Sequence, residues 1–144
     1  MTAIKRDPID TVLSTLVRMR DAWTCLRCRK QYVQGDARGL DASHICGRAK
    51  RATRYYPPNL VSHCRGCHQY LGANPMEFTE WTENYHGKEF ADYLKRLGNT
   101  TIKLSKQDKA DILADYKAQL ETMQPGDDLE TPAVLLLKIR SAGL

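Results

Sequence analysis

The chain has 144 residues, of which 42% are hydrophobic and 27% charged, values that are ordinary for a single folded domain. Its net charge is +5, but residues 1–70 carry 13 Lys/Arg against 5 Asp/Glu, whereas residues 71–144 carry 9 against 12. The longest apolar run, residues 133–137, is too short to cross a membrane, and the charged residues 5–7 interrupt any signal-peptide core, so we expect a cytoplasmic protein with no membrane partner.

The first predicted element is a helix that begins after Asp7. Asp7 is followed by Pro8, the arrangement of a helix cap with proline at the first helical position. The next apolar residues fall on one face at helical spacing: Ile9, Val12, Leu13, Leu16 and Val17. We therefore expect a helix of about three turns that leads to a buried Trp23.

Four of the five cysteines form two C-x2-C pairs, Cys25 with Cys28 and Cys64 with Cys67. A two-residue gap directs both sulfurs of a pair at a common point, and two such pairs suit four thiolates around one tetrahedral zinc ion. In the cytoplasm thiols stay reduced, which favours zinc over disulfides. We predict a structural Zn²⁺ site, and we interpret Cys46 as a small apolar strand residue.

The segment between the two cysteine pairs contains the signals of a β-hairpin. Residues 31–33 are a plausible short strand, residues 35–39 have turn composition, and residues 40–45 form a second strand. Residues 47–58 combine basic residues, tyrosines and two prolines, and they predict a surface loop without regular structure.

The rest of the chain is predicted to be helical. The second cysteine pair leads into a helix that carries His68 on its first turn. Capping residues and apolar spacing then predict helices over residues 74–87, 90–98 and 105–120, a linker over 124–131 and a last helix over 131–143. This last helix is apolar most of the way round, so it either packs into the core or docks on another chain.

Three polar residues near the cysteines have no role in a purely structural zinc site: His44, Asn59 and His68. Phosphodiester hydrolysis requires a deprotonated nucleophile, neutralised charge on the phosphate and help for the leaving oxygen. A neutral histidine can take a proton from water, and a divalent cation supplies the other two requirements. An asparagine amide can hold a histidine in one tautomer or a loop in one place.

The combined pattern C-x2-C, D-A-S-H-I, P-x-N-L and C-x2-C-H resembles the HNH endonucleases, also called ββα-metal or His-Me finger nucleases, in the subgroup with a four-cysteine zinc knuckle. Over residues 23–81 the chain is similar to phage recombination nucleases of the NinG/Rap type. The resemblance implies an α+β fold with a zinc-knuckled ββα-metal, treble-clef-like core. The helices on either side of residues 23–81 match no family. We expect a nuclease domain over residues 1–100, which includes the N-terminal helix, and a helical C-terminal extension over residues 101–144 as a candidate element for dimerisation or DNA contact.

The same resemblance implies an activity. The chain would hydrolyse phosphodiester bonds in branched recombination DNA, inside a phage-infected bacterial cell. His44 would act as the general base, Asn59 as an orienting residue, and His68 as a ligand of a catalytic Mg²⁺ or Mn²⁺ ion.

The chain departs from the family pattern at two ligand positions, which hold Ser43 and Gly72. Asp41 lies on the same face of the predicted strand as Ser43, so it can reach the catalytic metal directly or through water. Its alternative role is to cap the hairpin turn. His68 likewise has an alternative role as a zinc ligand beside Cys67.

A run of basic residues is expected to contact DNA phosphates: Arg48, Lys50, Arg51, Arg54 and Arg65. Tyr55 and Tyr56 would stack on bases or simply pack. His63 and His86 match no family position and are interpreted as surface or structural residues. A two-fold junction would suit a homodimer joined through the last helix. The rival hypothesis is a zinc-stabilised nucleic-acid-binding adapter that does not cleave.

Overall fold

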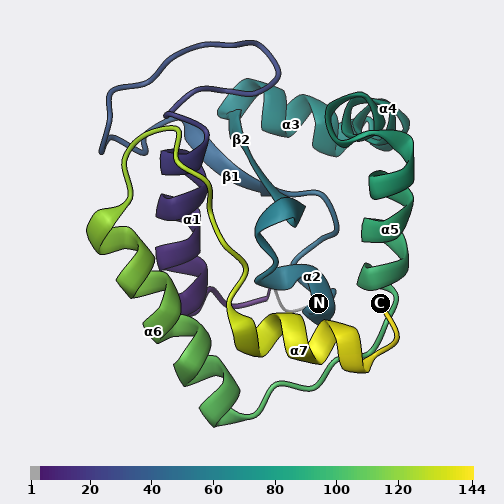
Figure 1. Cartoon of the computed structure of the whole chain (residues 1–144). Helices are drawn as coiled ribbons and strands as arrows, with labels where there is room; N and C mark the ends of the chain where they lie inside the picture. Colours follow the sequence, from purple (N-terminus) through teal and green to yellow (C-terminus); the bar gives the residue numbers. More distant parts are fainter. Residues whose placement is uncertain (1–3) are drawn as a thin grey trace.

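The computed structural model describes residues 4–144 and has a mixed α+β architecture (Figure 1). The described part contains seven α-helices and a two-stranded antiparallel sheet. In chain order the elements are α1 (Pro8–Arg20), β1 (Leu40–His44), α2 (Arg51–Arg54), the 3-10 helix η1 (Pro57–Asn59), β2 (Leu60–Cys64), α3 (Arg65–Ala73), α4 (Pro75–His86), α5 (Lys88–Gly98), α6 (Lys106–Thr122) and α7 (Ala133–Ser141). Among these helices none combines the length and the apolar character needed to cross a bilayer.

The sheet pairs β1 with β2 in antiparallel register, with Leu40 opposite Cys64 and His44 opposite Leu60. The predicted strand over residues 40–45 is confirmed, but the predicted partner over residues 31–33 is wrong. In that segment Gln31 makes only an isolated bridge with Thr24, and Val33 is 75% exposed. Residues 60–64 replace it because most of their side chains are buried, which gives the sheet a hydrophobic anchor on this strand.

Residues 47–58, predicted to be irregular, contain α2 and the start of η1. The segment is ordered because it packs inward. Ala52, Tyr55 and Tyr56 are buried in the main core, and two consecutive prolines begin η1. A four-residue helix is too short to leave a periodic signal in the sequence, so only its tertiary contacts reveal it.

The main core contains buried side chains of α1, α5, α6 and α7 and of the sheet, and within it α1 packs against α6 and both strands. The start of α1 carries a reciprocal capping box, in which Asp7 accepts from the N–H of Asp10 and Asp10 accepts from the N–H of Asp7. The apolar face predicted for this helix is confirmed, because Leu13, Leu16 and Val17 are fully buried. Figure 1 shows α6 alongside α1, and α7 near the start of α6, where Lys138 pairs with Asp108 at 3.4 Å.

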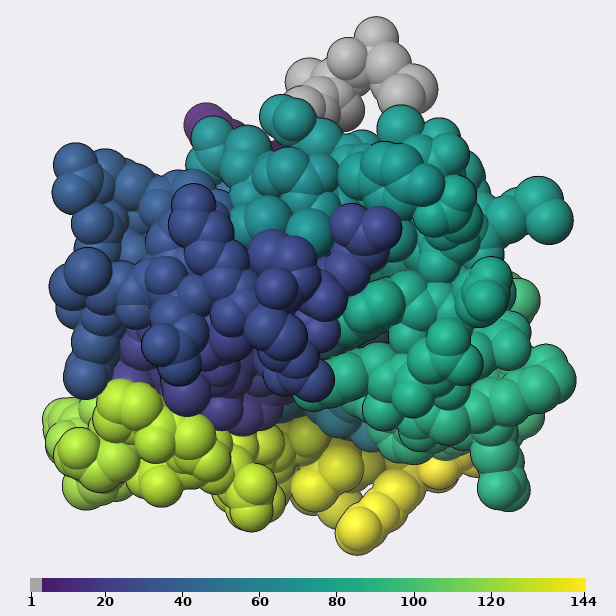
Figure 2. Space-filling model, turned by 90° about the horizontal axis from the view of Figure 1, so that it is seen from above, coloured from purple at the N-terminus to yellow at the C-terminus, as the bar shows by residue number. Residues whose placement is uncertain are grey.

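A second, smaller cluster surrounds the cysteines and consists of Trp23, Cys25, Leu40 and Cys67, with Tyr32 packed against it. Trp23 is 4% exposed, as its expected core position requires. Seen from above in Figure 2, the purple and blue N-terminal part of the chain lies between the lime-coloured part and the teal and green helices. The residues around the cysteines thus form a hydrophobic cluster separate from that of the main core.

The C-terminal helices follow the predicted boundaries closely. Gly87 adopts a φ of +85° between α4 and α5, a conformation that favours glycine and allows the sharp change in direction. Ser105 caps α6 through a second capping box with Asp108. On α7, Leu135 and Ile139 are buried while Leu137 is 61% exposed. One side of α7 therefore packs into the core and the other faces outward.

Candidate functional site

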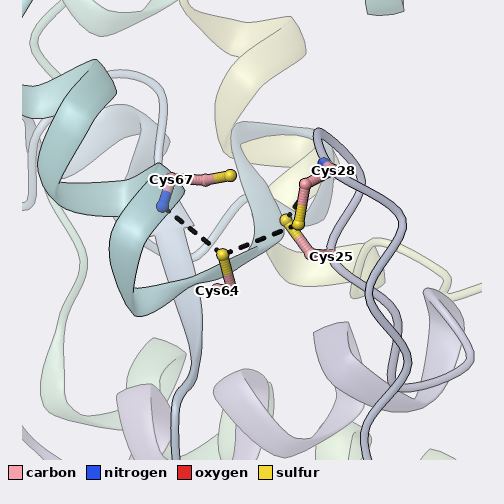
Figure 3. Close-up of side chains that lie close together, drawn as sticks. All are labelled: Cys25, Cys28, Cys64 and Cys67. Carbon is pink, nitrogen blue, oxygen red and sulfur yellow. Dashed lines mark hydrogen bonds between the residues drawn. The ribbon is translucent and has the colours of Figure 1, made fainter.

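The four paired cysteines converge on one point (Figure 3). All four sulfurs lie within 4.8 Å of one another, and the Sγ atoms of Cys28 and Cys64 are 3.7 Å apart. A tetrahedral zinc ion with Zn–S bonds of about 2.3 Å separates its sulfurs by about 3.8 Å. The geometry of this cluster therefore fits a zinc ion held by Cys25, Cys28, Cys64 and Cys67.

Backbone amides fix the position of the sulfurs within each pair. The N–H of Cys28 points at Cys25 Sγ at 3.5 Å, and the N–H of Cys67 points at Cys64 Sγ at 3.4 Å. Cys64 also caps the first turn of α3 with this contact. The C-x2-C spacing thus places one sulfur over the amide of the other cysteine in both pairs.

The two buried cysteines have different thiol acidities. Burial opposes ionisation of Cys25, but surrounding hydrogen bonds outweigh it and lower the pKa of this thiol to about 7. Burial raises the pKa of the Cys67 thiol to about 12. A zinc ion supplies the positive charge that a cluster of thiolates requires, so zinc binding and thiol deprotonation are coupled.

His44 and His68 line one shallow cleft of about 480 Å³, although they come from β1 and α3. The remaining walls consist of three small residues, one isoleucine and one arginine: Ala42, Gly47, Ala49, Ile4 and Arg48. The sequence-predicted histidines therefore share one accessible surface.

The ring of His44 is held by the backbone of α2. Its Nε2 lies 3.3 Å from the carbonyl oxygen of Arg54, which can only accept a hydrogen bond. Nε2 therefore carries the proton, and Nδ1 is left with the lone pair. Burial lowers the pKa of His44 to about 4, so the ring is neutral at physiological pH.

His68 is held by Asp41, which lies 27 residues earlier in the chain. His68 Nδ1 is 2.9 Å from Asp41 Oδ2, while Arg65 contacts both oxygens of the same carboxylate at 3.2 Å. Although burial opposes ionisation, the hydrogen bonds from Arg65 and His68 keep the pKa of Asp41 below its usual value. The bond to Asp41 places the proton on Nδ1 and leaves Nε2 of His68 as the potential metal-binding atom.

Asn59 is completely buried and binds backbone groups at the start of the preceding segment and in α2. Its Oδ1 accepts from the N–H of Cys46 at 2.7 Å. Its Nδ2 donates to the carbonyls of Cys46 and Thr53 at 2.9 and 3.1 Å. Of the two roles considered for its amide, the structure has the one that fixes the loop.

The two positions that depart from the family pattern lie away from the cleft lining. Ser43 is 1% exposed, and within residues 4–144 no group hydrogen-bonds its hydroxyl. Gly72 lies on the exposed side of α3. Neither offers a ligand to the cleft.

Arg54 and the two adjacent tyrosines are part of the packed structure. The guanidinium of Arg54 is 2.6 Å from the buried carboxylate of Asp10 and 3.6 Å from that of Asp7. Tyr55 and Tyr56 are 3% and 8% exposed, so they pack and cannot stack on bases. These ion pairs of Arg54 link α2 to the start of α1.

The other basic residues differ in their partners. Arg48 donates to the carbonyl of Ile4 at 3.3 Å, and Lys50 donates to the side chain of Asn99 at 2.8 Å. Arg65 pairs with Asp41, and Arg51 is exposed. Arg48 is the one member of the set that lines the cleft of the two histidines.

The histidines outside the cleft have structural surroundings. His63 is fully buried, and its ring packs edge-on against Trp81, with 4.6 Å between ring centroids. His86 is half-buried, with its Nε2 2.8 Å from the carbonyl oxygen of Pro58. A structural role is therefore assigned to both, and His63 is not a surface residue.

Two positioning residues escaped the sequence-based expectations, Arg20 and Asp21. Arg20 donates to the carbonyls of Pro57 and Leu60 at 3.0 and 2.6 Å, and Asp21 accepts from the N–H of Ser62 at 2.9 Å. Together they fasten η1 and β2 to the end of α1. The one signal available was a basic–acidic pair after an amphipathic helix, which is too common to indicate this role.

Comparison with known proteins adds no assignment, because no family model, curated protein or solved structure matches this chain. The structure establishes a mixed α+β fold and a four-cysteine cluster that can hold a metal ion. Any function for the histidine cleft therefore depends on the chemistry of the residues described above.

Proposed function

We propose that this chain is a metal-dependent DNA endonuclease of the HNH type, with a structural zinc ion in a treble-clef-like ββα-metal core. The observation that carries the proposal is the convergence of His44 and His68 in one open cleft. The pairing of β1 with β2, followed directly by α3, supplies the strand, strand and helix in the order that such a core requires.

His44 is the proposed general base. Its Nε2–H is directed at the carbonyl oxygen of Arg54, so Nδ1 is the atom that accepts a proton from the attacking water. The lowered pKa keeps the ring neutral, which makes the lone pair available at neutral pH. Asn59 acts indirectly, because it fixes the loop that contains Arg54.

His68 is the proposed ligand of the catalytic ion, through Nε2. Asp41 orients the ring from the opposite nitrogen, an arrangement common among metal-binding histidines. A divalent cation at this position would neutralise charge on the phosphate and assist the leaving oxygen. With one imidazole assigned as a metal ligand and few other protein ligands in the cleft, the site suits a loosely held Mg²⁺ or Mn²⁺ better than a tightly bound zinc ion.

The proposed substrate is branched DNA of the kind formed in recombination. DNA as the substrate agrees with the excess of basic residues in the first half of the chain. The preference for branches rests on the family resemblance alone. A homodimer would match the two-fold symmetry of a junction, and the exposed Leu137 on α7 is the proposed contact. Sedimentation of Leu137→Glu beside the unchanged protein tests that contact: a monomeric unchanged protein would contradict it.

The test of the proposal is a cleavage assay on supercoiled plasmid and on a four-way junction, with Mg²⁺ and with Mn²⁺. We expect the unchanged protein to cut and His44→Ala to bind DNA equally well without cutting. His86→Ala is the matched control, because His86 is also half-buried and also contacts a backbone carbonyl through Nε2. Retained cleavage by His44→Ala would contradict the assigned base.

The second candidate is a nucleic-acid-binding adapter without nuclease activity. The buried Ser43 and the exposed Gly72 favour it, because at these two of the family's metal-ligand positions the chain has no metal-binding side chain. The same assay separates the two candidates. If the unchanged protein binds DNA with either metal but never cuts it, the adapter hypothesis replaces the nuclease hypothesis.

A further inference from the structure

A second concave feature lies beside α2 and is distinct from the histidine cleft. It is a recess of about 160 Å³, formed where α2 meets the segment that leads into α6. Its lining consists of Arg51, Arg54, Tyr55, Ile102, Leu104 and Lys109. All charged side chains in this lining are positive. The recess therefore has the character of an anion site, and it joins the nuclease-like half of the chain to the C-terminal extension.

The three cations of the recess are not equivalent. Arg54 is held by Asp10 and Asp7, so most of its charge is already balanced and its position is fixed. Arg51 and Lys109 are exposed, and in the described part of the chain neither forms an ion pair with a carboxylate. These two side chains are thus the ones available to meet an anion from solution.

The floor of the recess is apolar and rigid. Ile102 and Tyr55 are buried, and the hydroxyl of Tyr55 donates to Asp7. From α6, the hydroxyl of the fully buried Tyr116 donates to the carbonyl oxygen of Tyr55 at 2.5 Å. Because an apolar floor excludes water, charges at its rim interact more strongly than on an open surface. α6 therefore fixes the floor through Tyr116 and supplies a cation through Lys109.

We propose that this recess binds one backbone phosphate of the DNA strand that enters the histidine cleft. Arg51 and Lys109 are the contacting residues, and Arg54 is a fixed part of the lining because it pairs with Asp10 of α1. This inference rests on the proposed function, since it names the part of the DNA that the same protein holds. The volume is well below the roughly 300–1,000 Å³ of small-molecule pockets, so a phosphate group fits it and a base with its sugar does not.

The recess and the cleft are mechanically linked by α2. The carbonyl oxygen of Arg54 holds the His44 ring, and the side chain of the same residue lines the recess. A phosphate held there fixes the strand relative to His44, which gives residues 101–144 a role in DNA contact. Phosphate contacts of this kind set the position of a protein on DNA without reading its sequence.

The experiment measures binding of a fluorescein-labelled DNA duplex by zinc-loaded protein, without added Mg²⁺, as a function of KCl concentration. One phosphate contact contributes about 0.9 to the slope of log K against log salt. We expect the double variant Arg51→Ala/Lys109→Ala to lose about 0.9 from this slope and about fivefold in affinity at 150 mM KCl. A loss of about 1.8 would place the two side chains on separate phosphates and overturn a shared site.

Lys117→Ala is the matched control, because Lys117 is also exposed on α6 and does not line the recess. We expect its slope to equal that of the unchanged protein. If the double variant and this control behave alike, the phosphate site is wrong even when the unchanged protein binds and cuts DNA. If the double variant loses slope but no protein cuts, the phosphate site stands and the nuclease proposal fails. If the unchanged protein does not bind DNA, both fail.

Discussion

The cysteine cluster and the main core are stabilised in different ways, although they share the strand β1. The main core buries apolar side chains from α1, α5, α6 and α7, including Leu13, Leu97 and Ile112. Around the cysteines the buried residues are few, and Arg27, Arg29 and Lys30 are exposed. A region with so little apolar burial needs another source of stability, which a metal ion supplies in many small domains. We therefore expect loss of a zinc ligand to unfold the cysteine region, and truncation of a buried apolar side chain to destabilise the main core.

The largest expected effect is removal of a zinc ligand. Structural zinc ions contribute about 10–16 kcal/mol of apparent binding free energy in small zinc-dependent folds. We expect Cys64→Ser to lose bound zinc and to expose the amides around the cysteine cluster to hydrogen exchange, while α1 and α6 stay protected. Zinc content and hydrogen exchange measured by mass spectrometry check this result. Cys46→Ser is the control, and equal zinc loss in that variant would contradict the assignment of the ligands.

A truncation in the main core should lower the stability of the fold and leave zinc binding unchanged. Leu13→Ala removes a fully buried side chain and is expected to lower the free energy of unfolding by about 2–5 kcal/mol without changing the zinc content. Urea denaturation followed by circular dichroism measures this loss. Val33→Ala, at a position that is 75% exposed, should stay within about 0.5 kcal/mol of the unchanged protein. A similar loss in both variants would contradict the assignment of the core.

A third prediction concerns Asn59, whose side chain holds the segment between the two strands. Asn59→Ala leaves one buried N–H and two carbonyls without their side-chain partner, at a cost of about 3 kcal/mol. Because the amide fixes the loop that holds Arg54, we also expect DNA cleavage to fall while DNA binding is retained. Asn99→Ala is a suitable comparison, since it removes an exposed amide that contacts Lys50 alone. Unchanged stability of Asn59→Ala would show that the loop is held by other contacts.

The smallest expected effect is on the pH dependence of cleavage. The pKa of His44 is lowered to about 4, so the neutral base is fully present above pH 6 and is lost only as the pH falls toward 4. Since the unfolded chain binds this proton near pH 6.5, acid also destabilises the fold over the interval from 6.5 down to 4. Single-turnover cleavage should vary little with pH between 6 and 8. A rate that rises with a midpoint near 6.5 would contradict the burial of His44.

Local signals in the sequence were sufficient for every helix of nine or more residues, whereas the four-residue α2 was not predicted. Asp7 with Pro8 marks the start of α1, and Ser105 with Asp108 marks that of α6; both capping boxes form in the structure. The strand β2 was missed because four of its five residues are buried, which removes the alternating pattern that marks a half-buried strand. Strand pairing depends on contacts between residues that are distant in sequence, and the residues of one short strand do not indicate its partner.

In the candidate site, too, contacts set by local spacing were predicted from the sequence, and contacts between distant segments were not. The spacing of the cysteines alone predicts that their sulfurs meet, because each pair is local and the zinc geometry is fixed. The contact between Asp41 and His68 spans 27 residues, and it depends on how α3 leaves the sheet. The support that Arg20 gives to η1 and β2 spans 37 and 40 residues. Such contacts follow from tertiary packing, which a single sequence does not reveal.

The separation of the two cysteine pairs has a topological consequence. Cys28 and Cys64 lie 36 residues apart in sequence but 3.7 Å apart at their sulfurs. A metal ion bound there closes a loop that contains Asp41, His44 and Asn59. Closing a loop of this length removes conformational entropy from the unfolded chain, worth about 4 kcal/mol if the ion acts as a disulfide does. Zinc supply would thereby set the fraction of chains in which the histidine cleft is assembled, although the ion lies outside that cleft.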